Sequence, residues 1–402
     1  MFVKDIDDEV YWNKFLDYKI NSEFVSKSEK KVISKFILEK KYKKITSSIS
    51  EGNYSFSIPK LHIISKENSR KKRQVYSFND EEMIILKYIA FLLHNYDFLF
   101  SDNLFSFRKN LSIKTAVNKI KKITTLNNMY CYKIDIRNYF NSINVDILLN
   151  SLKKDIKDKE LYTFISNIIS NKQYTYNNNL FLGEKGVMAG TPISAFLANY
   201  YIREIDEFFL EKQINYFRYS DDIIFFCKTK EEVLKYSNLL KKLLTKYRLE
   251  VNEDKEFLFK PGDKIEFLGF SFCDGIIDLS TNTVNKMKSK IRRSGRSIRR
   301  WMLKKDVSSD KALKVMIRKY NKKFYGVDDT ELSWKWWFFT SINTTESLKL
   351  IDKHLQEHLR YLVTGRHNKK NYKLVPYDVL KKIGYKSLVH EYYLFTNMKR
   401  NM

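Results

Sequence analysis

Tyr216-Phe217-Arg218-Tyr219-Ser220-Asp221-Asp222-Ile223-Ile224-Phe225-Phe226 is the stretch that decides the fold. Aromatic and β-branched residues lie on both sides of a short polar break, a pattern typical of two strands joined by a tight turn. Ser220 and Asp221 fall at or near the tip, so Asp221 and Asp222 lie together at the end of a largely apolar hairpin. Crowded carboxylates at the edge of a low-dielectric core favour a divalent cation. The alternative is a solvated acidic turn, since Asp is common in turns.

A third carboxylate lies in another apolar strand. The segment Tyr130-Cys131-Tyr132-Lys133-Ile134-Asp135-Ile136 reads as a strand with one acid deep inside it. A lone buried Asp is strongly destabilising unless it is paired or bound to a metal ion. Asp135 is therefore the candidate third metal ligand, and a hydrogen-bonded core acid is the alternative.

The charge balance indicates a polyanionic partner. The chain has 402 residues and a net charge of +27, from 74 Lys and Arg against 47 Asp and Glu. Such an excess favours nucleic acid, and the aromatic content of 15% offers rings that can stack on bases. A basic protein without such a partner is the alternative. The length allows two or three domains.

The sequence predicts a cytoplasmic protein with no membrane partner. No apolar run approaches the roughly 18 residues of a membrane span, and the first residues lack the pattern of a secretory signal. The three cysteines, Cys131, Cys227 and Cys273, are far apart and form no Cys-x-x-Cys pair. Free thiols in a reducing compartment are the simplest interpretation.

The first part of the chain alternates helical and strand-like patterns. Residues 1–50 have helical spacing, and two alternating segments, 61–65 and 73–78, predict a β-hairpin with a basic tip. Asn79 or Asp80 is expected to cap a helix over 81–95, and Ser112 to cap another. Between 146 and 180 we expect two helices and an Asn-rich linker.

The second part contains a loop, more helices and a basic region. A flexible loop over 183–190 precedes Thr191, the expected N-cap of a helix with Pro192 in its first turn. We expect a helix over 231–247 and a strand or tight hairpin over 267–272. From about residue 281 cations are dense, and four of the five tryptophans lie beyond residue 300. This region is predicted to be a helical domain that holds nucleic acid.

Together these pieces predict a polymerase. Asp135, Asp221 and Asp222 would hold two Mg²⁺ ions, with Mn²⁺ as the alternative metal. Such a pair activates an attacking hydroxyl and stabilises the leaving pyrophosphate. Lys66 and Arg73, at the hairpin tip, would supply cations for a nucleoside triphosphate.

The order of the motifs resembles the palm of a reverse transcriptase. The motifs that carry this resemblance are Ile134-Asp135-Ile136 with Phe140, Gly186-x-x-Ala189-Gly190-x-x-x-Ser194-x-x-Leu197-x-Asn199, Tyr219-Ser220-Asp221-Asp222, Leu249-x-x-Asn252-x-x-Lys255 and Phe267-Leu268-Gly269-Phe270. The resemblance implies an α+β right-hand polymerase fold, with fingers and palm built from antiparallel sheet and packed helices. The implied domains are an N-terminal helical cap (1–50), fingers and palm (51–280) and an α-helical, basic, thumb-like domain (281–402).

The resemblance also implies roles for particular residues. It makes Asp135, Asp221 and Asp222 catalytic and gives the metal ions the Ile136 carbonyl as a further ligand. The residues that it implies for nucleotide binding are Lys66, Arg73, Ile136, Phe140, Gly190 and Lys255. The residues that it implies for template and primer are Arg108, Ala189, Phe267, Leu268 and Gly269. In the family the position of Phe140 rejects a 2′-hydroxyl, which favours deoxynucleotides, and the position of Lys255 is a possible acid for pyrophosphate.

One departure points to a particular branch. Most reverse transcriptases have Pro-Gln-Gly where this chain has Met188-Ala189-Gly190, and that glutamine helps to place the template base. The Ala-Gly-Thr-Pro-Ile-Ser form, with Ser106-Phe107-Arg108, resembles the bacterial defence-associated reverse transcriptases, the unknown-group and abortive-infection lineage. This resemblance implies antiphage defence, RNA-directed or template-atypical DNA synthesis, and a structured non-coding RNA and DNA product as partners. A homo-oligomer or an accessory protein is compatible with it.

Several alternatives stay open. A retron or group II intron reverse transcriptase is one, although no maturase-like or endonuclease segment is evident after the palm for the intron version. A catalytically idle RNA-binding protein with a relic palm is another. His354-x-x-Glu357-His358 has the spacing of a zinc peptidase motif, but its histidines are expected on the solvated side of a helix. Tyr392 and Tyr393 are candidate protein primers.

Overall fold

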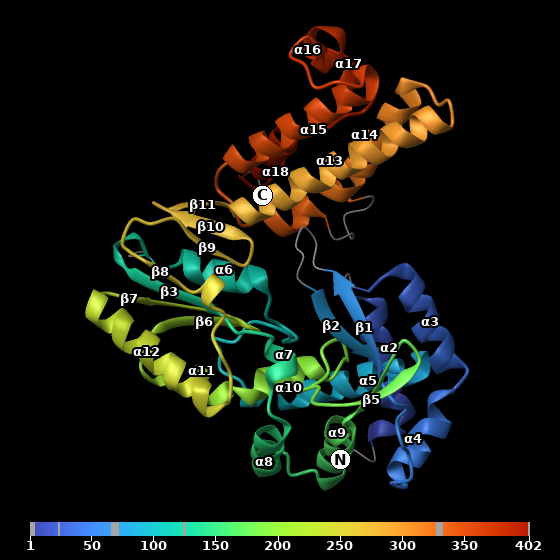
Figure 1. Cartoon of the computed structure of the whole chain (residues 1–402), viewed down its shortest axis with the longest axis vertical. Helices are drawn as coiled ribbons and strands as arrows, with labels where there is room; N and C mark the ends of the chain where they lie inside the picture. The colour runs from blue at the N-terminus through green and yellow to red at the C-terminus, as the bar shows by residue number, and fades with distance from the viewer. Residues whose placement is uncertain (1–4, 23–24, 66–71, 124–125, 327–332, 401–402) are drawn as a thin grey trace. The chain divides into compact units, whose positions relative to one another are not determined.

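The computed structural model describes residues 5–22, 25–65, 72–123, 126–326 and 333–400 (Figure 1). It divides into two compact units. The first consists of Met1–Ala116 and Asn128–Pro261, and the second of Val117–Asn127 and Gly262–Met402. The predicted α+β class, with antiparallel sheets and a helical C-terminal region, is confirmed.

The first unit begins with helices that share one aromatic core, as the helical spacing predicts. They are α2 (Glu9–Ile20), α3 (Lys27–Leu38), α4 (Tyr42–Ser50), α5 (Asp80–Leu93) and the 3₁₀ helix η1 (His94–Leu99). The buried Trp12 ring stacks on Tyr42 and Tyr88, with centroid separations of 4.3 and 3.8 Å. Such ring pairs add about 1 kcal/mol to the free energy of apolar burial. Asn79 caps α5 by accepting a hydrogen bond from the Glu82 N–H.

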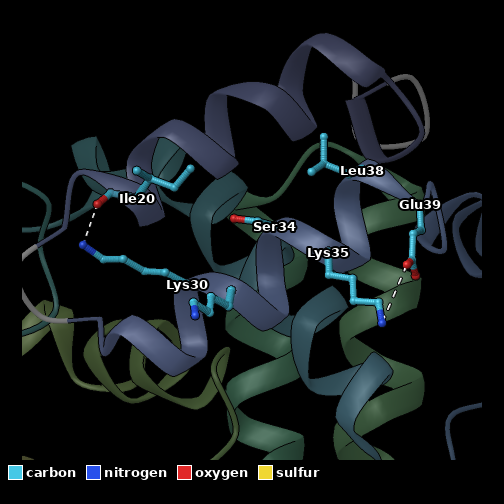
Figure 2. Close-up of a pocket in the computed structure, with 7 residues that line it drawn as sticks. Ile20, Lys30, Ser34, Lys35, Leu38 and Glu39 are labelled. Atoms are coloured by element: carbon cyan, nitrogen blue, oxygen red, sulfur yellow. Dashed lines mark hydrogen bonds and ion pairs between the residues drawn. The ribbon is translucent and has the colours of Figure 1, made fainter.

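Residues of α2 and α3, with Glu39 after α3, line an open pocket (Figure 2). Its lining includes Ile20 at the end of α2 and Leu38 at the end of α3, both exposed. The Lys30 ammonium group donates to the Ile20 carbonyl, so it satisfies a backbone group at the C-terminal end of α2. The pocket therefore lies where the C-terminal end of α2 meets α3.

The predicted fingers hairpin forms part of a four-stranded sheet. Strands β1 (Lys60–Ser65) and β2 (Lys72–Ser77) pair antiparallel, and β4 (Gln173–Tyr176) and β5 (Asn179–Leu182) complete the order β2-β1-β4-β5. The expected Asn-rich linker was therefore wrong, because it is the turn of the β4–β5 hairpin. Asn177 and Asn178 both have positive φ, a conformation that Asn tolerates better than most residues.

The helices of the middle region differ from the prediction around residues 191–202, where one expected helix starts later and is divided into two at Ile202. They are α6 (Ile113–Lys121), the 3₁₀ helix η2 (Leu126–Asn128), α7 (Tyr139–Ser142), α8 (Val145–Asp155), α9 (Lys159–Ser170), α10 (Ser194–Tyr201) and α11 (Arg203–Glu211). Thr191 is not the N-cap of α10, which begins at Ser194. The Thr191 hydroxyl instead donates to the Met188 carbonyl, while the Thr191 carbonyl accepts from the Ser194 N–H in a turn that precedes the helix.

The palm sheet has the order β6-β7-β3-β8. Its strands are β6 (Asn215–Tyr219), β7 (Asp222–Cys227), β3 (Tyr130–Asp135) and β8 (Phe257–Phe259), and all of their pairings are antiparallel. Helices α11 and α12 (Lys230–Lys246) pack against this sheet (Figure 1), and the 3₁₀ helix η3 (Glu253–Lys255) precedes β8. The interior residues of β7 are buried on both faces, which explains their continuous apolar run.

The second unit contains a small sheet and a set of helices. Its elements are β9 (Ile265–Phe267), β10 (Phe270–Cys273), β11 (Ile276–Leu279), α13 (Thr281–Lys304), α14 (Ser309–Tyr325), the π-helix η4 (Lys335–Phe339), α15 (Glu346–Thr364), α16 (Asn371–Leu374), α17 (Tyr377–Lys382) and α18 (Leu388–Arg400). Asp278 of β11 accepts hydrogen bonds from Ser347 of α15, which ties the sheet to the helices. The predicted domain bounds at 50 and 280 stay a proposal.

Among the residues described, none of the helices combines the length and apolar character needed to cross a bilayer.

Candidate active site

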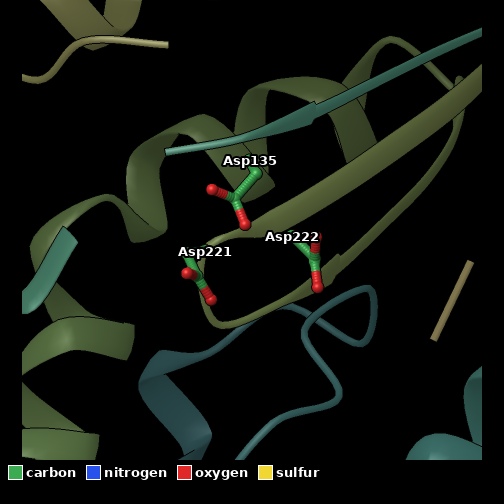
Figure 3. A group of neighbouring side chains, drawn as sticks. All are labelled: Asp135, Asp221 and Asp222. Carbon is green, nitrogen blue, oxygen red and sulfur yellow. The ribbon is translucent and has the colours of Figure 1, made fainter. Parts of the chain in front are cut away.

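Three carboxylates meet at one end of the palm sheet (Figure 3). Asp135 ends β3, Asp222 begins β7, and Asp221 lies in the turn before it. Asp135 and Asp222 are direct cross-strand partners, and oxygen atoms of all three carboxylates lie within 4.8 Å of one another. The chain thus brings together the three acids that the sequence singles out. In the described part of the chain, this is the only group of three or more acidic, histidine or cysteine ligands with that geometry.

A tight turn presents two of the three acids. Tyr219 and Asp222 pair across the hairpin, which leaves a loop of Ser220 and Asp221. Ser220 has a φ of 60°, the positive value that a type II′ turn needs at its first loop residue. The Ile136 N–H donates to the Asp221 carbonyl at 3.0 Å, so the turn is also bonded to the residue that follows β3.

The electrostatics of the site favour a cation. Burial raises the pKa of Asp222 to about 6, and the negative charges of Asp221 and Asp135 add to this rise. Burial and the charge of Asp135 raise the pKa of Asp221 as well. A divalent ion would relieve this repulsion, and three hard carboxylate ligands suit Mg²⁺ or Mn²⁺.

Residues after α12 support Asp135. The Asn252 N–H donates to the Asp135 carbonyl at 2.8 Å, and the Asn252 amide group donates to the Asp135 carboxylate at 3.2 Å. The Lys255 ammonium group forms an ion pair with the same carboxylate while its side chain stays 49% exposed. Lys255 therefore lies beside the acids that are candidate metal ligands, and its role with pyrophosphate stays a prediction.

An aromatic group flanks the carboxylates. Phe107 lies 6.4 Å from both Phe140 and Tyr219, measured between ring centroids. Tyr219 directly precedes the acidic turn, and Phe140 follows Asp135 in α7. Phe140 is half-buried, and Phe107 is exposed. The proposed position of Phe140 under the sugar of a nucleotide is compatible with this arrangement.

The loop before α10 packs closely against strand β2 and helix α7. The Tyr76 N–H of β2 donates to the Ala189 carbonyl at 2.7 Å. A Cβ atom at Gly190 would lie 2.2 Å from the Val75 side chain, and one at Gly186 would lie 2.1 Å from the Phe140 carbonyl. Both glycines also have positive φ, so glycine is required at both positions.

The basic side chains that the sequence predicts to bind substrates differ in their exposure and their contacts. Arg73 is exposed on β2, and although burial raises the pKa of Asp221, the charge of Arg73 is one of those that oppose the rise. Lys66 lies outside the described residues. Arg108 points inward: its side chain is 12% exposed, lies near Asp97 and donates to the Ser101 carbonyl. A contact between Arg108 and a template would require the side chain to leave these partners.

The proposed primer-binding residues lie in the second unit. Phe267 ends β9 and is buried, while Leu268 and Gly269 form the two-residue turn to β10. Both turn residues have positive φ, as a type I′ hairpin requires. The predicted tight hairpin is confirmed, and its role with a primer stays a proposal.

Sequence reasoning missed a buried polar network behind the acidic turn. It consists of Ser106, Asn199, Asp206, Arg218 and Ser220. Arg218 was visible as a charged residue inside an apolar strand. Since a buried charge needs a partner, this signal predicts that Arg218 has one, but it does not say which residues form the network.

Two secondary motifs also change in the structure. His358 is buried against Gly295, so the expectation that both histidines face solvent was wrong; α15 contacts α13, α14 and α18, which cover more than one of its faces. Tyr392 is buried, and its hydroxyl donates to the Ile342 carbonyl, whereas Tyr393 is exposed. Of these two tyrosines, Tyr393 is therefore the accessible one.

Comparisons with known proteins agree with this geometry. Residues 64–272 match the family described as reverse transcriptase (RNA-dependent DNA polymerase). Group II intron-encoded protein LtrA of Lactococcus lactis subsp. cremoris is 28% identical over 215 residues, which cover 51% of this chain and 34% of that protein. The putative COX1/OXI3 intron 2 protein of Saccharomyces cerevisiae is 25% identical over 229 residues, covering 53% and 26%.

The chain spans about a third or less of the length of these curated relatives. A solved structure of apo telomerase from Candida tropicalis, truncated from its C-terminal domain, aligns with a TM-score of 0.43 and 17% identity. That alignment covers 56% of this chain and 55% of the telomerase chain.

Three carboxylates that converge at the end of one sheet suit a two-metal site, the kind that polymerases, nucleases and phosphatases use. Since the family match covers more than half of the chain, the protein belongs to the reverse transcriptase family, the RNA-dependent DNA polymerases.

Proposed function

We propose that this chain is an active reverse transcriptase that joins deoxynucleotides by two-metal catalysis. The observation that carries the proposal is the convergence of Asp135, Asp221 and Asp222 within a reverse transcriptase domain. Their carboxylate oxygens, and the raised pKa values of Asp221 and Asp222, suit a pair of divalent cations, for which we propose Mg²⁺, with Mn²⁺ as a substitute.

Each residue of the proposed active site would have a separate role in nucleotide transfer. Asp135, Asp221 and Asp222, with the Ile136 carbonyl, would hold the metal ions, which supply an activated hydroxyl and charge neutralisation at the leaving pyrophosphate. Arg73 would bind the triphosphate. Further proposed nucleotide contacts are those of Lys66, Phe140, Gly190 and Lys255, with Lys255 near enough to Asp135 to meet the pyrophosphate. Template and primer contacts are proposed for Arg108, Ala189 and the Phe267–Gly269 turn.

The biological setting is also a proposal. We assign the chain to antiphage defence in the cytoplasm, working with a structured non-coding RNA and a DNA product, alone, as an oligomer or with an accessory protein. The support is the Met188-Ala189-Gly190 segment, which lacks the glutamine that most relatives use to place a template base. The backbone of Ala189 is held by Tyr76, so this position lies against the fingers strand β2.

A group II intron or retron type of reverse transcriptase is the second candidate. The similarity to LtrA, described as a group II intron-encoded protein, favours the intron version. A catalytically idle RNA-binding protein is the third, and it predicts RNA affinity without incorporation of any deoxynucleotide.

One experiment separates these functions. The protein is purified from its host with its bound nucleic acid, and the RNA and any DNA are sequenced before and after incubation with deoxynucleotides. A DNA product copied from a discrete cellular RNA supports the proposal, whereas copying of intron RNA supports the intron type. The double variant Asp221→Ala, Asp222→Ala is expected to abolish both the product and phage protection. Protection that survives in this variant would refute the catalytic account.

A further inference from the structure

The acidic turn is held from behind by side chains that cannot touch a substrate. Ser106, Asn199 and Arg218 are all at most 1% exposed, and Ser220 is 6% exposed. They come from three separate parts of the first unit: the loop after η1, helix α10 and strand β6. Ser106 and Arg218 bond to the N–H and carbonyl groups of Ser220 in the turn, and Asn199 bonds to both Ser106 and Arg218.

The Ser106 hydroxyl makes two bonds at once. It accepts a hydrogen bond from the Ser220 N–H at 2.8 Å and donates one to the Asn199 side-chain oxygen at 3.0 Å. The Asn199 amide group in turn donates to the Ser106 carbonyl at 2.8 Å. The Ser106 hydroxyl therefore donates its single hydrogen to Asn199 and accepts a hydrogen bond from the turn.

Arg218 and Asp206 complete the support. The Arg218 guanidinium donates to the Asp206 carboxylate, to the Asn199 carbonyl at 2.9 Å and to the Ser220 carbonyl at 3.4 Å. Both members of the Arg218–Asp206 pair are fully buried. Backbone bonds from Arg218 to Asn103 and from Phe105 to Arg218 bind the Ser106 loop to β6 as well.

Ser220 is a residue that needs such support. Its φ of 60° lies in a region that residues other than glycine rarely adopt, and its neighbours Asp221 and Asp222 repel each other. Without bonds to both its N–H and its carbonyl, the turn could relax and move the two carboxylates apart. The network holds the carboxylates together before any cation binds, a condition that lowers the free-energy cost of assembling the site.

We propose that Ser106 is a positioning residue for divalent-metal binding, acting through Ser220 on Asp221 and Asp222, with Asn199, Arg218 and Asp206 as its support. This inference rests on the proposed polymerase function, because it assigns the metal site to that reaction. Its consequence is that removal of one buried hydroxyl, with no contact to a ligand, weakens metal affinity.

The test compares three serine variants of the full chain. Ser106→Ala removes the hydroxyl, Ser106→Thr keeps it, and Ser237→Ala is the matched control. Ser237 is also buried in the first unit, but its hydroxyl donates to the Leu234 carbonyl of its own helix. Mn²⁺ binding to the enzyme without nucleotide is measured by electron paramagnetic resonance, and thermal unfolding is recorded for each variant.

Ser106→Ala is expected to weaken Mn²⁺ binding about 10- to 100-fold, the usual effect of losing a group that orients a metal ligand. Ser106→Thr and Ser237→Ala are expected to bind like the wild type. In deoxynucleotide incorporation, Ser106→Ala should lose kcat with little change in KM for the nucleotide, and raised metal concentration should restore part of the rate. Wild-type Mn²⁺ affinity in Ser106→Ala, or an equal loss in Ser237→Ala, would overturn the inference.

The outcomes also separate this inference from the proposed function. If the wild type incorporates no deoxynucleotide, the polymerase proposal fails, while Mn²⁺ binding still tests Ser106. If the wild type polymerises and Ser106→Ala binds Mn²⁺ normally, only the positioning role fails. Should Ser106→Ala not fold, Ser106→Cys replaces it. Because a thiol is a weak hydrogen-bond donor and acceptor, weaker Mn²⁺ binding in this variant supports the inference and unchanged binding refutes it.

Discussion

Two regions of this protein carry residue patterns of metal sites, and only one of them assembles a site. At the end of the palm sheet, Asp135, Asp221 and Asp222 bring their carboxylate oxygens within 4.8 Å of one another. On α15, His354 and His358 have the spacing of a zinc motif, but their ring nitrogens hydrogen-bond to the carbonyls of Lys288 and His354, both at 3.0 Å.

The difference lies in the surroundings of each motif. The acidic turn is held by hydrogen bonds from Ser106, Arg218 and Ile136 to its backbone, and its carboxylates lie beside that of Asp135. A ring nitrogen of each histidine hydrogen-bonds to a backbone carbonyl. Burial lowers the pKa of His358 to about 4. Ligand spacing along one element is thus weaker evidence for a metal site than convergence of ligands from several elements.

The largest effect is expected from removing one acid of the triad. Asp222→Ala should reduce deoxynucleotide incorporation at least about 10³-fold, which corresponds to about 4 kcal/mol of transition-state stabilisation from the metal ions. Primer extension with radiolabelled nucleotides measures this loss. The control is Glu211→Ala, at an exposed acid at the end of α11 in the same unit. Normal activity in Asp222→Ala would contradict the assignment of the site.

A smaller effect is expected for sugar selection. Phe140→Ala should raise incorporation of ribonucleotides relative to deoxynucleotides by about 10²-fold, since a close-packed ring is what excludes a 2′-hydroxyl from the proposed site. Competition between the two nucleotide types in one extension reaction measures the ratio. Phe98→Ala, which removes an exposed ring of η1, serves as the control. An unchanged ratio in Phe140→Ala would place the sugar elsewhere.

Electrostatic strain in the triad should be visible in stability. The pKa of Asp222 is raised in the folded state to about 6, so its contribution to stability is present below about pH 4 and lost as pH rises through 6. In EDTA, Asp222→Asn should therefore stabilise the protein by about 3 kcal/mol at pH 8 and by much less at pH 4. Urea unfolding of both proteins at the two pH values provides the measurement. A less stable Asp222→Asn at pH 8 would show that the carboxylates are not strained.

The smallest effect is expected at the histidines. His354→Gln and His358→Gln should leave Mn²⁺ binding and the metal dependence of incorporation unchanged. Because the pKa of His358 is lowered, the folded state resists protonation, and stability should fall as pH drops from 6.5 towards 4. His358→Gln should remove this acid-dependent loss in a thermal unfolding series. Loss of Mn²⁺ binding in either variant would show that the histidines also bind metal, as is proposed for the three acids.

Local patterns predicted much of this molecule. The β6–β7 hairpin and its Ser220-Asp221 turn follow from the aromatic and β-branched residues on both sides of a short polar break. Asp135 is buried as expected, but it lies at the end of β3 rather than deep inside the strand. Patterns failed where a turn competed with a helix, as at Thr191, and where two asparagines supplied the positive φ of a hairpin rather than a linker.

The supporting network could not be read from any local pattern. Ser106 bonds to Ser220 and Asn199, which are 114 and 93 residues away along the chain. In the sequence, only Arg218 indicates the network, because it is a charged residue inside an apolar strand. Its partner Asp206 lies on α11, whose acidic residues look like those of any solvated helix.

The most direct test of the central claim is anomalous diffraction from crystals soaked with Mn²⁺ and a deoxynucleoside triphosphate. The account predicts Mn²⁺ peaks about 2.1 Å from carboxylate oxygens of Asp135, Asp221 and Asp222. It predicts no peak beside His354 or His358. Absence of Mn²⁺ from the three carboxylates, with nucleotide bound elsewhere, would contradict it.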